Sequence, residues 1–319
     1  NDIRSESPMA RRLIVDACRH WLRQYGVDGF RFDLAHLIDM DTLDAISEMA
    51  REERPGVILI AEPWSFGGNN KQALGRREQW SLWNDDFRDT VKSFVQGKVK
   101  DSKKVLEVLD GSRNLWASRP ENCVNYLESH DDHTLVDFLS HRKDKDGSHP
   151  SRSEIKMNRM ASMMLLTTPG PVMLAQGQEL LRSKGGCGNS YDQGDRVNAI
   201  DWSRRESCSG HGEFIRSLIE FRSSKEGEAL RSTKSRKLIP GDRPRALGLR
   251  IPGERDLILL LNAEKRKSAS FRLPQGTWKQ VADLDRVLVD EHKAVEVKGS
   301  LQLGPIDGRL LLSAKQKPG

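Results

Sequence analysis

The chain has 319 residues, of which 31% are charged and 36% hydrophobic, and its net charge is +6. This length predicts a large folded domain together with a smaller one. No apolar run reaches the roughly 18 residues needed to cross a bilayer, so no membrane partner is expected. The positive excess is scattered among acidic residues without a basic block interleaved with aromatics, which argues against a nucleic-acid partner.

The four cysteines lie far apart, with no CxxC pair and no histidine at ligand spacing. Free thiols are therefore expected, and no metal site is predicted. No cofactor is expected to be required, although a structural calcium ion is left open. The compartment stays undecided, because the chain begins at Asn1 and a targeting segment could precede it.

The first half of the chain alternates helical and extended patterns. A first helix is expected from Ser7 as N-cap, through Pro8 in its first turn, to a stop at Gly26. The next segments read in turn as strand, helix and strand: residues 27–34, 39–56 and 57–64. The last of these is apolar without alternation, as in a parallel strand covered on both faces. Helix–strand alternation predicts a parallel α/β fold.

The pattern continues to about residue 231 and then changes. The expected elements are a short strand or turn leading into a helix at 80–98, a helix at 101–112, a strand at 123–132, a charged surface loop at 140–154, helices at 154–170 and 211–227, and a strand at 171–177. From residue 232 short strands alternate with Gly, Pro and Asn turns, which predicts an antiparallel β-sandwich. We therefore predict two domains, residues 1–231 and 232–319.

Acidic residues stand at the ends of three predicted strands. Alternation places Arg31 and Asp33 on one face of the first strand, in the stretch GFRFDLA. Glu62 ends the second strand, and His130 with Asp131 ends the third. Any one acid could equally be a helix cap or a structural ion pair. Three at the carboxyl ends of parallel strands favour an active site.

Two carboxyl groups can hydrolyse a glycosidic bond with retention when one is ionised and the other holds a proton. Asp33 suits the first role because Arg31 can hold it charged, and we expect Arg31 and Asp33 to be buried. Glu62 suits the second role, since it follows an apolar strand and lies near other acids. Trp64 and Phe66 could stack on sugar rings or, equally, pack a loop.

The segments GVDGFRFDLA, ILIAEPW and VNYLESHDD resemble three of the four signature segments of the α-amylase family of glycoside hydrolases. The stretches NDIRSESPMARRLIVD, WNDDFRD and RSKGGCGNSYDQGDRVNAIDW are similar to pullulanase-type debranching members, whereas WSFGGNN differs from the loop of many pullulanases. The resemblance implies a partial (β/α)8 TIM barrel, about strands four to eight, followed by a C-terminal antiparallel β-sandwich. Asp33 would be the nucleophile, Glu62 the general acid/base and Asp131 the third carboxylate, with Arg31 and His130 as supporting partners.

The implied substrate partner is an α-glucan, cleaved at α-1,6 branch linkages of pullulan, glycogen or starch dextrins. Residues that would contact the glucan, or that are ordinary turn residues, are Asn189, Tyr191, Asp195 and Asn198. The family's first signature segment is not found. The resemblance thus implies a missing N-terminal half of the barrel as a further partner, without which this chain would be inactive.

Several alternatives remain open at this point. The chain could come from an isoamylase-like debrancher, an α-1,4-acting amylase or a glucanotransferase of the same family. It could also be a non-catalytic glucan-binding relative, although such proteins usually lose at least one of the acids.

Overall fold

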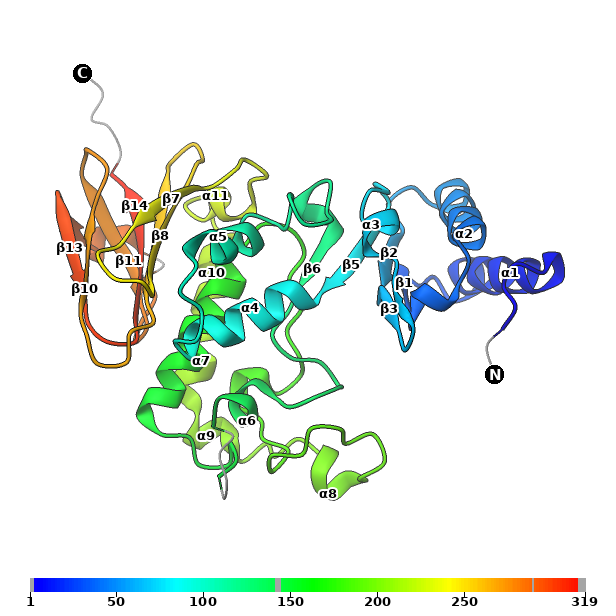
Figure 1. The fold of residues 1–319 in the computed structure, drawn as a ribbon, viewed down its shortest axis with the longest axis horizontal. Coiled ribbons are helices and arrows are strands. Elements are labelled where there is room, and N and C mark those ends of the chain that lie inside the picture. Colours follow the sequence, from blue (N-terminus) through cyan, green and yellow to red (C-terminus); the bar gives the residue numbers. More distant parts are fainter. Residues whose placement is uncertain (1–2, 141–144, 289, 315–319) are drawn as a thin grey trace. The chain divides into compact units, whose positions relative to one another are not determined.

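The computed structural model describes residues 3–140, 145–288 and 290–314, so residues 141–144 of the expected surface loop lie outside the described residues. It divides into two compact units, one formed by Asn1–Asn84 with Gly111–Val124 and the other by Asp85–Asp110 with Asn125–Gly319 (Figure 1). Within these described ranges, no helix combines the length and the apolar character that a membrane crossing requires.

The first unit contains the helix and strand alternation that the sequence predicts. Its elements are α1 (Pro8–Gln24), β1 (Gly29–Phe32), η1 (Ala35–Leu37), α2 (Met40–Glu53), β2 (Ile58–Ala61), β3 (Trp64–Ser65), β4 (Gly68–Asn69), α3 (Lys71–Leu74), β5 (Trp80–Asn84), η2 (Pro120–Asn122) and the start of β6 (Cys123–Asn125). The sheet order is β1-β2-β5-β6, and β2 pairs in parallel with both β1 and β5. The predicted parallel sheet is therefore confirmed for these strands.

Local sequence signals explain where these elements begin and end. The α1 helix starts at Pro8, and Gly26 ends the segment at a φ of +65°, a conformation that glycine adopts without a steric cost. The α2 helix is capped by Asp39, which accepts a hydrogen bond from Thr42 N at 3.0 Å. Aliphatic and aromatic side chains from α1, α2 and the strands form one core.

The second unit begins with helices that share one hydrophobic core with part of the C-terminal strands. The helices are α4 (Asp85–Val95), α5 (Ser102–Leu109), α6 (Leu135–Ser140), α7 (Arg152–Thr167), η3 (Gln178–Leu180), α8 (Asp195–Asn198), α9 (Arg204–Ser207), α10 (Ser209–Ser223), α11 (Glu228–Arg231) and η4 (Glu291–Lys293). Four methionine side chains of α7 are buried in this core: Met157, Met160, Met163 and Met164.

Two antiparallel sheets form the C-terminal part, as the sequence predicts. The strands are β7 (Lys237–Pro240), β8 (Ala246–Ile251), β9 (Leu257–Asn262), β10 (Ala269–Arg272), β11 (Trp278–Asp283), β12 (Val295–Val297), β13 (Ser300–Leu303) and β14 (Asp307–Ser313). Six of them follow the order β12-β11-β14-β9-β8-β7, and β10 pairs with β13. Along β9, Leu259 faces the core shared with the helices, whereas Leu260 faces a second core that includes β10 and β13 residues. Burial on both faces explains the unbroken apolar run LILLLN.

Two strand predictions were too long. The extended run expected at 171–177 is reduced to a single parallel bridge between Asn125 and Val172. Pro171 has no N–H to donate, and β6 is only three residues long. The pairing is therefore limited to two hydrogen bonds, made by the backbone N–H and the backbone carbonyl of Asn125. The strand expected at 123–132 likewise ends at Asn125. The division at residue 232 stays a prediction, since the second unit includes residues on both sides of it.

We expect Leu259→Ala and Leu260→Ala each to lower the free energy of unfolding by about 2–5 kcal/mol, because each leaves a cavity in a different core. Urea denaturation followed by circular dichroism measures this change. The control Val295→Ala, at an exposed position of β12, should change stability by less than about 0.5 kcal/mol. A leucine variant no less stable than this control would contradict a strand buried on both faces.

Candidate active site

The carboxyl ends of β1 and β2 place two acids next to each other in the first unit. Phe32 pairs with Ala61 in the parallel register, so Asp33 and Glu62 are the next residues on the two chains. Main-chain bonds fix this edge: Glu62 N donates to Phe32 O at 2.9 Å, and Ala35 N donates to Glu62 O at 2.8 Å. The backbone pairing therefore explains why Asp33 and Glu62 lie next to each other, as predicted.

A left-handed turn follows Asp33 immediately. Leu34 has φ 41° and ψ 47°, a conformation that costs a residue with a Cβ roughly 1–2 kcal/mol. Its N–H donates to Glu62 Oε2 at 2.9 Å. The strained turn thus aims a backbone donor at the Glu62 carboxyl group, and strain of this kind concentrates at functional sites.

Arg31 contacts both acids from the same face of the sheet. Its Nη1 donates to Asp33 Oδ1 at 2.6 Å, and its Nη2 lies 3.1 Å from Glu62 Oε2 without the alignment of a hydrogen bond. Its guanidinium carbon stands 4.4 Å from the centre of the Trp83 ring, within cation–π range. One stacked cation therefore holds the two carboxyl groups on the same side of the sheet.

The two acids have different solvent environments. Glu62 is 4% exposed, and burial raises its pKa, against the opposing effects of the Leu34 N–H and the Arg31 charge. The negative charge of Asp33 raises the pKa of Glu62 further. Asp33 itself was expected to be buried, and that expectation was wrong: its side chain is 69% exposed. The left-handed turn ends the strand at this point, so the carboxylate leaves the covered part of the sheet.

Aromatic side chains lie beside this pair. The rings of Trp64 and Trp83 are 6.3 Å apart at 55°, and Trp64 is half-buried. Phe66, in the turn between β3 and β4, is fully exposed. The sugar-stacking role suggested for Trp64 stays a prediction, and its contact with Trp83 also gives it a packing role.

His130 and Asp131 belong to the second unit, in the segment that follows β6. His130 Nε2 lies 3.4 Å from Asp131 Oδ2, and both side chains are more than half exposed. The next residue, Asp132, has a φ of +60° and its carbonyl accepts a hydrogen bond from Lys184 Nζ at 2.6 Å. Arg88 Nη1 donates to the Asp132 carboxylate at 3.4 Å. The segment that carries the predicted pair is thus braced by two basic side chains.

Sequence reasoning missed two buried charged residues near this segment. Glu128 is buried and accepts a hydrogen bond from Leu135 N at the start of α6, which closes the loop between them. Burial raises the pKa of Glu128 to about 7 and lowers the pKa of Lys92 to about 8. Each charge partly opposes the effect of burial on the other. The available signal was the acid within the apolar run CVNYLE, where a solvated side chain is not expected.

The four suggested glucan contacts lie in the segment around α8. Asn189, Tyr191 and Asp195 are exposed, and Tyr191 is 82% exposed. Asn198 is engaged within the loop: its Nδ2 donates to Ser190 O at 2.6 Å, and its Oδ1 accepts from Ser190 Oγ at 2.8 Å. Contact with glucan stays a prediction for all four, and Asn198 has a bracing role within the chain.

No group of three or more His, Cys, Asp or Glu side chains that could hold a metal ion occurs within the part of the chain that the structure describes. The four cysteines are free. That no cofactor is required, and that a structural calcium ion is possible, both stay predictions.

Comparison with known proteins decides the family. Residues 1–205 match the α-amylase catalytic domain. The chain is 35% identical over 254 residues to the pullulanase of Bacillus subtilis (strain 168), covering 73% of this chain and 35% of the relative. The chain belongs to the α-amylase family.

Solved structures agree with this membership of the α-amylase family. A pullulanase from Bacillus acidopullulyticus superposes with a TM-score of 0.87 at 27% identity, covering 98% of this chain and 41% of that one. The type I pullulanase of Bacillus subtilis str. 168, complexed with maltose, gives a TM-score of 0.86 at 28% identity, covering 99% and 48%. The chain therefore spans between about a third and a half of the length of these relatives.

The charges around Glu62 should move its pKa in opposite directions. Asp33→Asn removes a negative neighbour and is expected to lower the pKa of Glu62, whereas Arg31→Gln removes a positive one and is expected to raise it. Titration of the 13C carboxyl signal of Glu62 measures both shifts. Asp28→Asn, at the opposite end of the same strand region, is the matched control and should leave the signal unchanged. Shifts of the same sign in Asp33→Asn and Arg31→Gln would contradict the described geometry.

Glu128 should make stability fall with rising pH. Its pKa rises from 4.5 to about 7 on folding, so between these values the folded protein holds a proton that the unfolded chain has released. The stabilisation is fully present below about pH 4.5 and is lost as the pH rises through about 7. Urea unfolding at pH 5 and pH 7.5 should show a smaller decline in Glu128→Gln than in the unchanged protein. Glu220→Gln, at an exposed position of α10, should keep the full decline; equal declines in all three proteins would contradict a buried, protonated Glu128.

Proposed function

We propose that a protein containing this chain is a retaining glycoside hydrolase that cleaves α-1,6-glucosidic linkages in pullulan, glycogen or starch dextrins. One observation carries the proposal: a buried Glu62 with a raised pKa adjoins an exposed Asp33, and both contact Arg31. This pairing supplies the protonated acid and the ionised nucleophile that the retaining reaction needs. The pullulanase relatives support the choice of linkage.

In the first half of the proposed reaction, Asp33 attacks the anomeric carbon of the sugar on the non-reducing side of the bond. Glu62 transfers its proton to the glycosidic oxygen as the bond breaks, so the leaving chain departs as a neutral alcohol. Arg31 orients Asp33 for the attack through its hydrogen bond to Oδ1. The product is a covalent ester between the glucan and Asp33.

In the second half, Glu62 is an anion and removes a proton from an incoming water molecule. The water attacks the anomeric carbon, the ester bond to Asp33 breaks, and the configuration of the starting linkage is restored. Glu62 regains its proton. We assign Asp131 the role of a third carboxylate that holds sugar hydroxyls in the transition state, with His130 as its neighbour.

The proposed substrate contacts rest on side-chain chemistry. Trp64 and the exposed Phe66 offer flat apolar faces of the kind that sugar rings stack on. Asn189, Tyr191 and Asp195 offer exposed polar groups that can bind hydroxyls. A maltose complex of a pullulanase that resembles this chain supports an α-glucan as the ligand.

For the fold, we propose that β1, β2, β5, β6 and the bridged residue Val172 correspond to strands four to eight of a (β/α)8 barrel. The sequential sheet order and the family membership support this assignment. Partial barrels leave strand edges unpaired. The proposal therefore retains the expectation that the chain alone turns over little or no pullulan.

The test uses a protein that contains this chain and is complete enough to act on pullulan. Glu62→Gln should lower the rate on pullulan by about 10²–10⁴-fold, as expected for loss of a general acid. It should lower the rate of the first burst of fluoride release from maltotriosyl fluoride far less, since fluoride leaves without a proton, whereas the later hydrolysis of the ester still needs Glu62 as a base. Asp33→Asn should lose turnover of both substrates. Asp28→Asn is the matched control and should keep both activities.

The products separate the proposal from its alternatives. Maltotriose from pullulan is the expected result, measured by chromatography, and retention is read from the anomer formed first. Reducing ends from linear amylose, without pullulan cleavage, would replace the linkage assignment with an α-1,4-acting amylase. Glucan binding without turnover that is indifferent to Asp33→Asn would identify a binding protein instead.

A further inference from the structure

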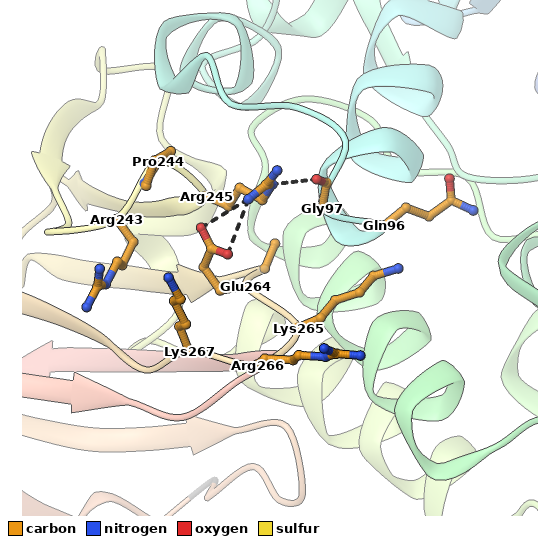
Figure 2. A pocket seen from close by; sticks show the side chains of 10 residues that line it. Gln96, Gly97, Arg243, Pro244, Arg245, Glu264, Lys265, Arg266 and Lys267 are labelled. Carbon is orange, nitrogen blue, oxygen red and sulfur yellow. Dashed lines mark hydrogen bonds and ion pairs between the residues drawn. The ribbon is translucent and has the colours of Figure 1, made fainter.

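A cavity of about 660 Å³ lies in the second unit, and no residue assigned to the reaction lines it. Three segments far apart in the sequence form it: the end of the α4 segment, the β7–β8 loop and the β9–β10 loop (Figure 2). The residues that line it are Gln96, Gly97, Arg243, Pro244, Arg245, Ala263, Glu264, Lys265, Arg266 and Lys267. Its volume is that of a small-molecule site.

The lining holds five basic residues and a single acid. That acid, Glu264, is already neutralised by Arg245, whose Nη1 lies 3.3 and 3.2 Å from the two carboxylate oxygens. The Nε of Arg245 donates to Gly97 O, so this arginine also joins the α4 segment to the strands. The Arg245–Glu264 ion pair is therefore nearly neutral, and the bond to Gly97 O holds it in place.

The other four basic residues have no hydrogen-bond or ion-pair partner for their side chains among residues 3–140, 145–288 and 290–314: Arg243, Lys265, Arg266 and Lys267. Figure 2 shows Arg243 and Lys267 on one side of the Arg245–Glu264 pair, with Lys265 and Arg266 on the other. Like charges gathered around a concave surface repel one another and concentrate anions there.

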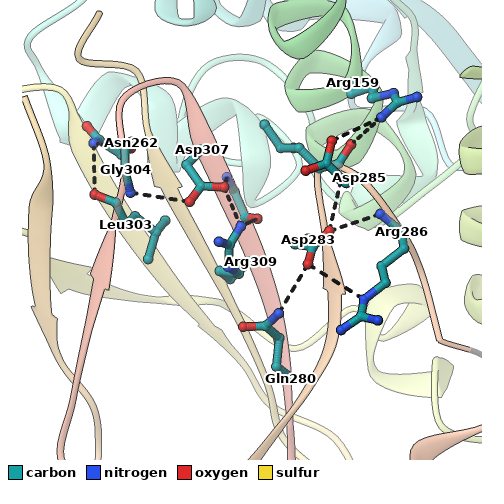
Figure 3. Close-up of polar contacts among 12 residues, drawn as sticks. Arg159, Asn262, Gln280, Asp283, Asp285, Arg286, Leu303, Gly304, Asp307 and Arg309 are labelled. Atoms are coloured by element: carbon teal, nitrogen blue, oxygen red, sulfur yellow. Dashed lines mark hydrogen bonds and ion pairs between the residues drawn. The ribbon is translucent and has the colours of Figure 1, made fainter. Parts of the chain in front are cut away.

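Several basic side chains elsewhere in the second unit are paired with acids. Figure 3 shows Arg309 with Asp307, and Arg159 of α7 with Asp285 at 3.4 Å. The cavity differs in that four basic residues outside any ion pair in the described part of the chain line one concave surface.

We propose that this cavity binds a small, multiply charged phosphate compound. Arg243 from one loop and Lys265, Arg266 and Lys267 from another offer the positive charge and the N–H donors that suit the acceptor oxygens of phosphate groups. No aromatic side chain lines the cavity, which disfavours nucleic acid, because single strands are bound by stacking on aromatics. The same absence disfavours a neutral sugar chain. The inference does not rest on the proposed hydrolase activity.

The test is isothermal titration calorimetry with inorganic pyrophosphate, at physiological salt. The double variant Lys265→Gln/Arg266→Gln should bind pyrophosphate about tenfold to a hundredfold more weakly, the loss expected for charge-assisted hydrogen bonds. Glu264→Gln removes the one acid and should bind more tightly, which a loss of folding could not produce. Lys293→Gln/Lys298→Gln, two exposed lysines outside the cavity, is the matched control and should bind as the unchanged protein does.

Two further titrations identify the source of the phosphate group. Tighter binding of glucose 6-phosphate than of inorganic phosphate assigns the site to a phosphorylated sugar, and the reverse order assigns it to the free ion. Absence of saturable binding of all three probes would overturn the proposal. Equal losses in the cavity variant and in the control pair would overturn it as well, since they would show attraction to the general surface charge.

Discussion

The first unit depends on one physical constraint: a carboxyl group, Glu62, is kept away from water beside a second carboxyl group that is exposed to it. Burial and the charge of Asp33 raise the pKa of Glu62, while the Leu34 N–H and Arg31 lower it. Burial is the largest of these effects, so the balance favours the protonated form more than in a free glutamate. The parallel register, the left-handed turn and the stacked arginine all maintain this balance, since each fixes a group that contacts one of the two acids.

A second buried glutamate, in the second unit, is held in a similar way. Glu128, like Glu62, follows a strand, is buried, and accepts a hydrogen bond from a backbone N–H of the turn or helix that comes next. In both places the backbone donor allows the carboxyl group to remain inside without a full countercharge. The positive charge of Lys92 lowers the pKa of Glu128, as the positive charge of Arg31 lowers the pKa of Glu62. Loops that carry exposed acids, Asp33 in one unit and Asp131 in the other, are thereby anchored at their bases.

The sequence predicts this arrangement in part, and the reasons are local. Period-two alternation places Arg31 and Asp33 on one face, and apolar runs identify the neighbouring strands, so the meeting of Asp33 with Glu62 could be expected. The left-handed Leu34 could not, because a leucine gives no signal for a positive φ; it is held there by its tertiary hydrogen bond. The exposure of Asp33 follows from that turn and was missed with it. The run at 171–177 has strand composition, but its pairing depends on how much of β6 is available, which no local pattern records.

Net charge is a similarly limited guide to binding. A value of +6 over 319 residues is typical of a solvated surface, and several basic side chains of the C-terminal strands and their loops are paired with acids. A better indicator of an anion site is the number of basic side chains in one region that have no acidic partner. In the β9–β10 loop three consecutive basic residues follow one acid, and that acid is already bound to Arg245 from another loop. Folding adds Arg243 of a second loop to these three residues, and the combined charge attracts anions to this concave part of the surface.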